Sequence, residues 1–203
     1  MYAETILDIA MNHSDTLIEK AKNGDRAAQG KLVNLWFKRI YNFAHKYFAD
    51  HDLAMEIAQE TFIVLHRKIC QLESVDKFKP WLYRITANLC HAESRKMQSA
   101  DRLRMNDDRQ EHEEEIASAP FYNPDKQFQH EELQRVLQKA LNALSTEQRA
   151  VVIMKEYEGL KFREIAEILS CSENTVKSRL YYGLSHLRQI LLAKNITTEI
   201  LEP

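Results

Sequence analysis

Apolar residues recur at intervals of three and four along most of the chain, which is the pattern of amphipathic helices. In the first third, Asp25 can cap a helix whose apolar face is Leu32, Leu35, Trp36, Ile40, Phe43 and Tyr47. Asp50 or Asp52 can cap the next helix, with these residues inward: Ala54, Ile57, Ala58, Thr61, Phe62, Leu65 and Ile69. Pro80 suits the first turn of a third helix. Its apolar side is Trp81, Leu82, Ile85, Leu89 and Ala92.

A second helical set begins near Phe128. The apolar face of its first helix is Leu133, Val136, Leu137, Ala140, Leu141 and Leu144. Ser145 and Gln148 have the spacing of a capping box, so they predict the start of the next helix. That helix runs to about Tyr157, and Gly159 suits the left-handed residue that follows it.

The last two predicted helices, residues 161–169 and 173–192, are separated by only three residues. Small Ala166 permits the close crossing that a helix-turn-helix requires. Residues near the start of a recognition helix reach base edges in the major groove. The polar face of the second helix therefore gives these candidate DNA contacts: Glu173, Asn174, Lys177, Ser178, Arg179, Tyr181 and Tyr182. An ordinary helical hairpin with a solvated face is the alternative.

Composition and charge define the organisation of the chain. It has only four Gly and four Pro in 203 residues, which disfavours β-sandwiches, Rossmann units and P-loops. Residues 61–98 carry a net charge of +4, whereas residues 99–127 carry −4 and contain two prolines. We therefore predict an all-α protein with two small helical domains, residues 1–98 and 128–203, joined by an acidic flexible linker over residues 99–127.

A second candidate surface lies on the predicted helix that starts near Pro80. Polar residues recur there at intervals of four, three and four, opposite the apolar side: Arg84, Asn88, His91 and Arg95. Lys77 adds positive charge, and Phe78 and Tyr83 lie where a base could stack. The seven candidate contacts are therefore Lys77, Phe78, Tyr83, Arg84, Asn88, His91 and Arg95. A solvated surface is the alternative interpretation.

Together these segments resemble those of a known family. The matching stretches, in order, are Ile57–Phe62, Phe78–Asn88, Tyr157–Leu169 and Thr175–Leu180. In this order and spacing the chain resembles bacterial RNA polymerase sigma factors of the extracytoplasmic-function (ECF) group of the sigma-70 family. The resemblance covers about residues 14–98 and 128–192.

The resemblance implies an alternative sigma factor that binds core RNA polymerase and directs promoter-specific initiation. The first domain would dock on the β′ clamp through Glu56, Gln59 and Glu60. The −10 element would be read and melted by the loop Leu72–Phe78 and by the face that carries Tyr83, Arg84, Asn88 and His91. Unstacking a base there needs compensating contacts. The helix-turn-helix would read the −35 element while its domain docks on the β flap. An anti-sigma factor is a further implied partner.

The chain departs from the family pattern in three places. Ser170 stands where Gly is frequent, and Ser in a left-handed conformation costs up to ~1–2 kcal/mol. Lys161 stands where Ser or Thr commonly caps a helix, which loses about 1 kcal/mol. The segment 91–96 is less basic than usual. These departures bear on the −10 sequence preference and leave the fold prediction unchanged.

Catalysis is not expected, because the densest carboxylates lie in the predicted linker and not on rigid elements. Those residues are Asp107, Asp108, Glu111, Glu113, Glu114 and Glu115. No GxSxG, HExxH or P-loop motif occurs, so we expect no cofactor. The three scattered cysteines and the absence of a membrane span or secretory signal predict a soluble protein in the reducing cytoplasm.

Two further alternatives stay open on the sequence. A metal sensor would use four possible ligands: His66, Cys70, Cys90 and His91. The cysteines serve equally well as small core residues. A stand-alone helix-turn-helix regulator would explain the C-terminal half but not the Pro80–Lys96 face. Independent operator binding would favour such a regulator, whereas a sigma factor needs the polymerase.

Overall fold

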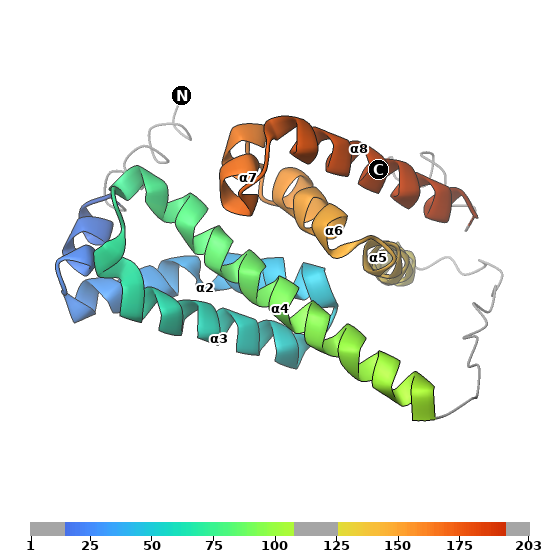
Figure 1. The fold of residues 1–203 in the computed structure, drawn as a ribbon, viewed down its shortest axis with the longest axis horizontal. Coiled ribbons are helices and arrows are strands. Elements are labelled where there is room, and N and C mark those ends of the chain that lie inside the picture. The colour runs from blue at the N-terminus through green and yellow to red at the C-terminus, as the bar shows by residue number, and fades with distance from the viewer. Residues whose placement is uncertain (1–14, 108–125, 194–203) are drawn as a thin grey trace.

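A computed structural model of the chain describes residues 15–107 and 126–193, and within these ranges the ordered elements are all helical (Figure 1). Residues 15–22 form a helix before the labelled elements. The longer elements are α2 (Arg26–Phe48), α3 (His51–Lys68), α4 (Phe78–Asp107), α5 (Lys126–Asn142), α6 (Thr146–Val152), η3 (Ile153–Tyr157), α7 (Phe162–Leu169) and α8 (Glu173–Ala193). Short 3₁₀ turns, η1 (Ile69–Gln71) and η2 (Val75–Lys77), join α3 to α4. The predicted all-α class is confirmed. In this part of the chain, no helix has the length and apolarity needed to cross a membrane.

Local sequence signals set the helix boundaries of the N-terminal domain, α2 to α4. The Asp25 carboxylate accepts hydrogen bonds from two amides of the first turn of α2. Asp50, not Asp52, caps α3, because its Oδ1 accepts from the Leu53 amide at 2.9 Å. Pro80 lies in the first turn of α4, as its missing N–H predicts.

The same holds in the C-terminal domain, α5 to α8. Ser145 Oγ accepts from the Gln148 amide while the Gln148 side chain accepts from the Ser145 amide, so the predicted capping box is present. The helix continues through η3, a π-helical turn, as far as Tyr157. Gly159 follows with a φ of +62°, the left-handed conformation predicted for it.

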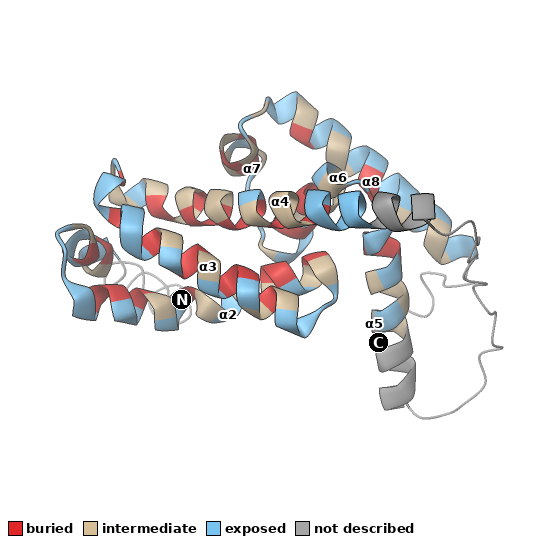
Figure 2. Ribbon diagram, turned by 60° about the horizontal axis from the view of Figure 1, so that its bottom comes forward, coloured by how far each residue is buried: buried red, intermediate tan, exposed pale blue. Residues whose placement is uncertain are grey.

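Helix α4 lies between two layers of helices (Figures 1 and 2). On one side it packs on α2 and α3, where Leu82 and Thr86 are fully buried and Thr86 pairs with Thr61. On the other side it packs on α6 and α7 of the C-terminal domain. The helix therefore buries two faces, which explains the fully buried Ala87 and Cys90 between its predicted apolar and polar sides.

The two domains share one hydrophobic cluster. The cluster runs from the α2–α4 residues into these C-terminal residues: Ala150, Val151, Ile153, Met154, Leu160, Ile165, Ala166, Ile168 and Val176. Arg149 contributes polar contacts, donating from Nη1 to the Tyr47 carbonyl at 2.8 Å with its guanidinium over the Tyr47 ring. Tyr47 lies at the C-terminus of α2, which carries partial negative charge, so the Arg149 cation is favourable there. The domains therefore pack closely instead of standing apart.

The linker prediction needs adjustment at both ends. Helix α4 continues through residues 99–107, which were expected to begin the linker, and α5 starts at Lys126. The acidic run, residues 111–115, lies outside the described residues. The tether between the two helices is therefore shorter than the composition indicates.

Candidate nucleic-acid interface

Helices α7 and α8 form a helix-turn-helix whose inner face is apolar. Ile165, Ala166, Ile168 and Val176 are buried, and α7 packs on α8 as well as on α4. The turn starts at Ser170, which takes a left-handed conformation with a φ of 51°. Ser172 Oγ then accepts from the Thr175 amide at 3.1 Å, so Ser172 acts as the side-chain cap of α8. The predicted turn is confirmed.

The N-terminal cap of α7 is incomplete. The Lys161 amide donates to Glu164 Oε2 at 2.6 Å. A lysine ammonium has no acceptor for the free amides of the first turn. The missing side-chain acceptor is the feature that the sequence predicts at Lys161, and Glu164 compensates for part of it.

The polar face of α8 is open to solvent. Glu173, Asn174, Lys177 and Ser178 are all exposed in the first two turns. Tyr181 and Tyr182 follow them, with 71% and 62% of their surfaces exposed. The remaining candidate, Arg179, is half-buried, and its Nη1 lies 3.8 Å from Cys171 Sγ. The structure therefore gathers all seven predicted residues on one helix and leaves six of them accessible.

The polar stripe of α4 is only partly accessible. Asn88 and Arg95 are exposed, whereas Arg84 and His91 are half-buried. The cover is the C-terminal domain, because α4 packs on both α6 and α7. The expectation that this stripe lies wholly opposite the core is therefore wrong for Arg84 and His91.

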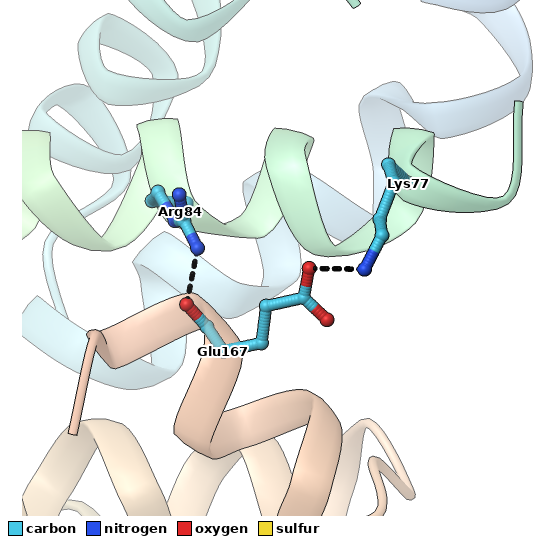
Figure 3. A network of polar contacts seen from close by, with 3 residues as sticks. All are labelled: Lys77, Arg84 and Glu167. Atoms are coloured by element: carbon cyan, nitrogen blue, oxygen red, sulfur yellow. Dashed lines mark hydrogen bonds and ion pairs between the residues drawn. The ribbon is translucent and has the colours of Figure 1, made fainter. Parts of the chain in front are cut away.

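Glu167 of α7 engages two of the basic residues (Figure 3). Its Oε1 lies 2.7 Å from Lys77 Nζ, and its main-chain carbonyl accepts a hydrogen bond from Arg84 Nη2. The Glu167 hydrogen bond raises the pKa of the Lys77 ammonium. Arg84 Nε is buried and has no hydrogen-bond partner. One residue of the C-terminal domain thus binds two candidate DNA contacts of the N-terminal domain.

The aromatic candidates are buried instead of presented for stacking. Phe78 is 1% exposed and lies edge-on to Trp36, with ring centroids 5.6 Å apart. Tyr83 is also 1% exposed, and its hydroxyl donates to Glu158. Burial and this carboxylate raise the pKa of the Tyr83 phenol. The expectation that both rings are available to a base is not met, because both complete the core between α2 and α4.

His91 lies at the contact between α4 and α6. Its Nε2 is buried and has no hydrogen-bond partner, and its ring centroid lies 6.2 Å from that of Tyr47. Burial lowers the pKa of the imidazole, and the charge of Glu147 opposes that shift. This histidine is therefore an interdomain contact in the arrangement described here.

A third surface runs along α3. Glu56 and Gln59 are exposed and Glu60 is half-buried, so the three predicted polymerase contacts share an accessible face. Ile63 continues this face one turn later, with 42% of its surface exposed. Ile63 was not among the contacts predicted from the sequence. The available signal was an isoleucine that falls outside the 3–4 spacing of the buried residues on this helix.

The possible metal ligands do not come together. No group of three His, Cys, Asp or Glu side chains among the described residues could hold a metal ion. His66 Nδ1 is hydrogen-bonded to Gln29 Oε1 at 2.6 Å, and Cys70 is exposed in η1. Cys90 is buried, and burial raises the pKa of its thiol. Cys90 therefore behaves as a core residue.

Comparison with known protein families accounts for these three surfaces together. Residues 32–100 match the family described as Sigma-70 region 2, and residues 134–187 match Sigma-70, region 4. The first match covers the α3 face and the α4 stripe, and the second covers the helix-turn-helix. The chain is a sigma factor of the sigma-70 family.

Curated relatives support this assignment over most of the chain. The RNA polymerase sigma-H factor of Pseudomonas aeruginosa is 25% identical over 175 residues, covering 85% of this chain and 91% of the relative. The ECF RNA polymerase sigma-E factor of Haemophilus influenzae is 27% identical, covering 81% and 88%. The ECF sigma factor SigE of Mycolicibacterium smegmatis is 33% identical, covering 83% of this chain and 64% of that protein.

Solved structures show the same fold. CnrH, in complex with the cytosolic domain of CnrY, superposes with a TM-score of 0.65 at 22% identity, covering 89% of this chain and 97% of that one. The sigma factor RpoE of Bartonella quintana, solved with the anti-sigma factor NepR, gives 0.59 at 25% identity, covering 80% and 95%.

The sigma factor thus acts in transcription initiation. A stand-alone regulator leaves the match to region 2 without an explanation. The N-terminal domain is therefore called region 2 below, and the C-terminal domain region 4.

Proposed function

We propose that region 4 reads the −35 element with the first turns of α8. Glu173, Asn174, Lys177 and Ser178 would face base edges, because they stand at the exposed start of the second helix of a helix-turn-helix. Arg179, Tyr181 and Tyr182 would contact the phosphates on either side. The observation that carries the proposal is the exposure of this polar face on a helix whose other side is buried.

Region 2 would recognise the −10 element through α4. Asn88 and Arg95 are accessible in the structure, and they support a contact surface on this helix. Lys77, Arg84, His91 and the Tyr83 hydroxyl would join them once region 4 moves away. Phe78 serves as a core residue that holds the start of α4 against Trp36.

Core RNA polymerase would dock on α3. Glu56, Gln59 and Glu60 supply charge and hydrogen-bonding groups, and Ile63 adds an apolar contact at the end of the same face. A mixed polar and apolar patch of this kind is typical of protein interfaces. Binding to the β′ clamp would place α4 over the DNA, and region 4 would dock separately on the β flap.

An anti-sigma factor is a further proposed partner. The relative from Bartonella quintana is described in complex with the anti-sigma factor NepR. The sigma factor would carry out no reaction of its own, act in the cytoplasm and need no cofactor. Its contribution would be to place two weak DNA-binding modules on one scaffold, which raises the effective concentration of each.

In vitro transcription tests the proposal. Purified bacterial core polymerase, with and without the sigma factor, would transcribe a pool of genomic fragments from the source organism. Transcripts that require the sigma factor and start downstream of two spaced motifs are the expected result. Absence of transcripts, together with no binding to core polymerase in a pull-down, would contradict it.

A further inference from the structure

The donors of the proposed −10 surface are already bound by acceptors from region 4. Lys77 pairs with the Glu167 carboxylate, Arg84 donates to the Glu167 carbonyl, and Tyr83 donates to the Glu158 carboxylate. Each acceptor is an oxygen that carries full or partial negative charge. Phosphate oxygens of DNA offer the same chemistry to the same donors.

A phosphate bound at these donors would lie against the carboxylate and the main-chain carbonyl of Glu167. Lys77 Nζ is 2.7 Å from Glu167 Oε1. The ammonium keeps two further N–H donors, but a phosphate placed there would be repelled by the Glu167 carboxylate. The half-buried Arg84 side chain is covered by the carboxyl end of α7 (Figure 3). DNA contact through this part of α4 therefore requires α7 to leave.

Contacts distant from Glu167 hold the same arrangement. At the carboxyl end of α2, Gln138 Nε2 donates to the Lys46 carbonyl at 2.8 Å, and Arg149 donates to the Tyr47 carbonyl. The Tyr47 hydroxyl donates in return to the Thr146 carbonyl at 3.3 Å. The shared apolar cluster joins these two contact areas. The closed arrangement thus rests on polar contacts at two places and an apolar core between them.

We propose that the free sigma factor is autoinhibited by its own region 4, whose Glu167 and Glu158 occupy the −10 surface in place of DNA phosphates. The inference rests on the proposed role of α4 in −10 recognition. In this closed form the polar face of α8 stays exposed, whereas the polar face of α4 is partly covered. Binding to polymerase would then have to supply the free energy that separates region 4 from region 2. If the closed form makes up ~90% of the free chain, its apparent affinity for polymerase falls about tenfold.

Distances between spin labels test the closed form directly. Labels at the exposed positions Lys38 of α2 and Gln189 of α8 report on the two domains. The exposed Cys70 and the partly exposed Cys171 would be replaced by Ser, and the buried Cys90 left in place. We expect one narrow distance distribution for the otherwise unchanged chain. A broad distribution reaching longer distances would overturn the proposal.

Substitution on the region 4 side tests the mechanism. Glu167→Lys places a cation beside Lys77 and Arg84, so the distribution should broaden toward longer distances. Glu156→Lys makes the same charge change at an exposed residue of η3 and should leave the distances unchanged. The double variant Lys77→Glu/Glu167→Lys restores an opposite pair and should bring back the narrow distribution. Circular dichroism establishes that each variant is helical.

Transcription at limiting sigma factor tests inhibition. Glu167→Lys should give several-fold more transcript than the parent when the sigma factor is scarce, and equal amounts when it is saturating. An open variant with no gain at limiting concentration would overturn autoinhibition. Failure of both the parent and Glu167→Lys to support any transcription would instead overturn the proposed sigma activity, while the distance measurement still decides whether the chain closes. If Glu167→Lys supported transcription and the parent did not, the result would support both autoinhibition and the proposed sigma activity.

Discussion

Lys177 is the single side chain that best tests −35 recognition. It is exposed on the second turn of α8, where its ammonium lies 5.8 Å from the centroid of the Phe162 ring. An ammonium at this place can donate to a guanine edge or to a phosphate. Its removal should therefore affect DNA binding without disturbing the core.

We predict that Lys177→Ala lowers transcription from −35-dependent promoters about five- to thirtyfold, the range that follows from losing ~1–2 kcal/mol of contact energy. Initial transcription rates on promoters with varied −35 sequences provide the measurement. Lys139→Ala, which removes an exposed lysine of α5, is the matched control and should have little effect. An equal, small loss on every −35 sequence would assign Lys177 to phosphate contact instead of base readout.

The Arg149 guanidinium donates hydrogen bonds to main-chain carbonyls of both domains. It donates to the carbonyls of Tyr47, Asn142 and Leu144, at 2.8, 2.6 and 3.4 Å. Burial lowers the pKa of this guanidinium, and the Coulombic effects of Tyr47 and Cys90 oppose the shift. Its Nε has no partner, so the site already carries one unpaired buried donor.

We predict that Arg149→Ala lowers the free energy of unfolding by about 1–3 kcal/mol, because it leaves the part-buried carbonyls of Tyr47 and Leu144 without this donor. Urea titration followed by circular dichroism gives the value. Arg188→Ala removes an exposed arginine of α8 and should change it by less than ~0.5 kcal/mol. Equal stability of the two variants would mean that water replaces the guanidinium at no net cost.

At the scale of elements, the turn between α7 and α8 carries a defined conformational cost. Ser170 has a φ of 51° and a ψ of 44°, in the left-handed region that disfavours a side chain with a Cβ. Its amide still bonds back to the Glu167 carbonyl, and the Cys171 amide bonds to the Ala166 carbonyl. Glycine in this position would keep both bonds and relieve the strain.

We predict that Ser170→Gly raises the stability of region 4 by about 0.5–1 kcal/mol, since the relief of strain exceeds the added freedom of the unfolded chain. Thermal unfolding followed by circular dichroism measures it. Ser185→Gly, inside α8, is the control and should lower stability by a similar amount. A loss of stability in Ser170→Gly would show that the hydroxyl makes a contact worth more than the strain.

The helix boundaries could be predicted from the sequence because their causes are local. Asp25, Ser145 and Gly159 act on amides or dihedral angles within a few residues, so their effect does not depend on the rest of the chain. The apolar faces that pair α2 with α3 could also be predicted, because periodicity alone identifies them.

The second buried face of α4 could not be predicted in this way. Arg84 and His91 look like solvent-exposed residues because they are polar, and their cover comes from residues more than fifty positions later. Polar residues that hydrogen-bond to a carboxylate or carbonyl of another domain show the same sequence pattern as polar residues that hydrogen-bond to water. Phe78 and Tyr83 were misplaced for a related reason, since an aromatic residue beside basic ones suits a core as well as a base.

At the scale of the whole molecule, α4 couples the two domains through groups that titrate in different ranges. His91 faces Glu147 of α6, Arg95 of its own helix, Arg179 of α8 and the ring of Tyr47. Burial raises the pKa of the Glu147 carboxyl, but hydrogen bonds from its own amide and from Thr146 outweigh burial and lower it. The pKa of Glu147 therefore lies below its ordinary value and away from the range in which the imidazole titrates.

The closed state should weaken as the pH falls below about 6.5. Burial lowers the pKa of His91 in the closed chain, whereas an open chain exposes the imidazole and restores its ordinary pKa of 6.5. The open form therefore binds more protons in the interval between these two pKa values, so closure is favoured above pH 6.5 and lost progressively below it.

Spin-label distances recorded between pH 7.5 and pH 5.5 measure this dependence on the free chain. We expect the long-distance population to grow as the pH is lowered through the window below 6.5. His91→Gln keeps a polar side chain that does not titrate, so its distribution should stay constant over the same range. A parent chain that is equally closed at both limits, or a His91→Gln chain that opens as the parent does, would place the proton-sensitive group elsewhere. The pKa of Glu147 is lowered from its ordinary value, so this neighbour does not account for a response in that window. The comparison with His91→Gln separates the His91 imidazole from every other titratable group of the chain.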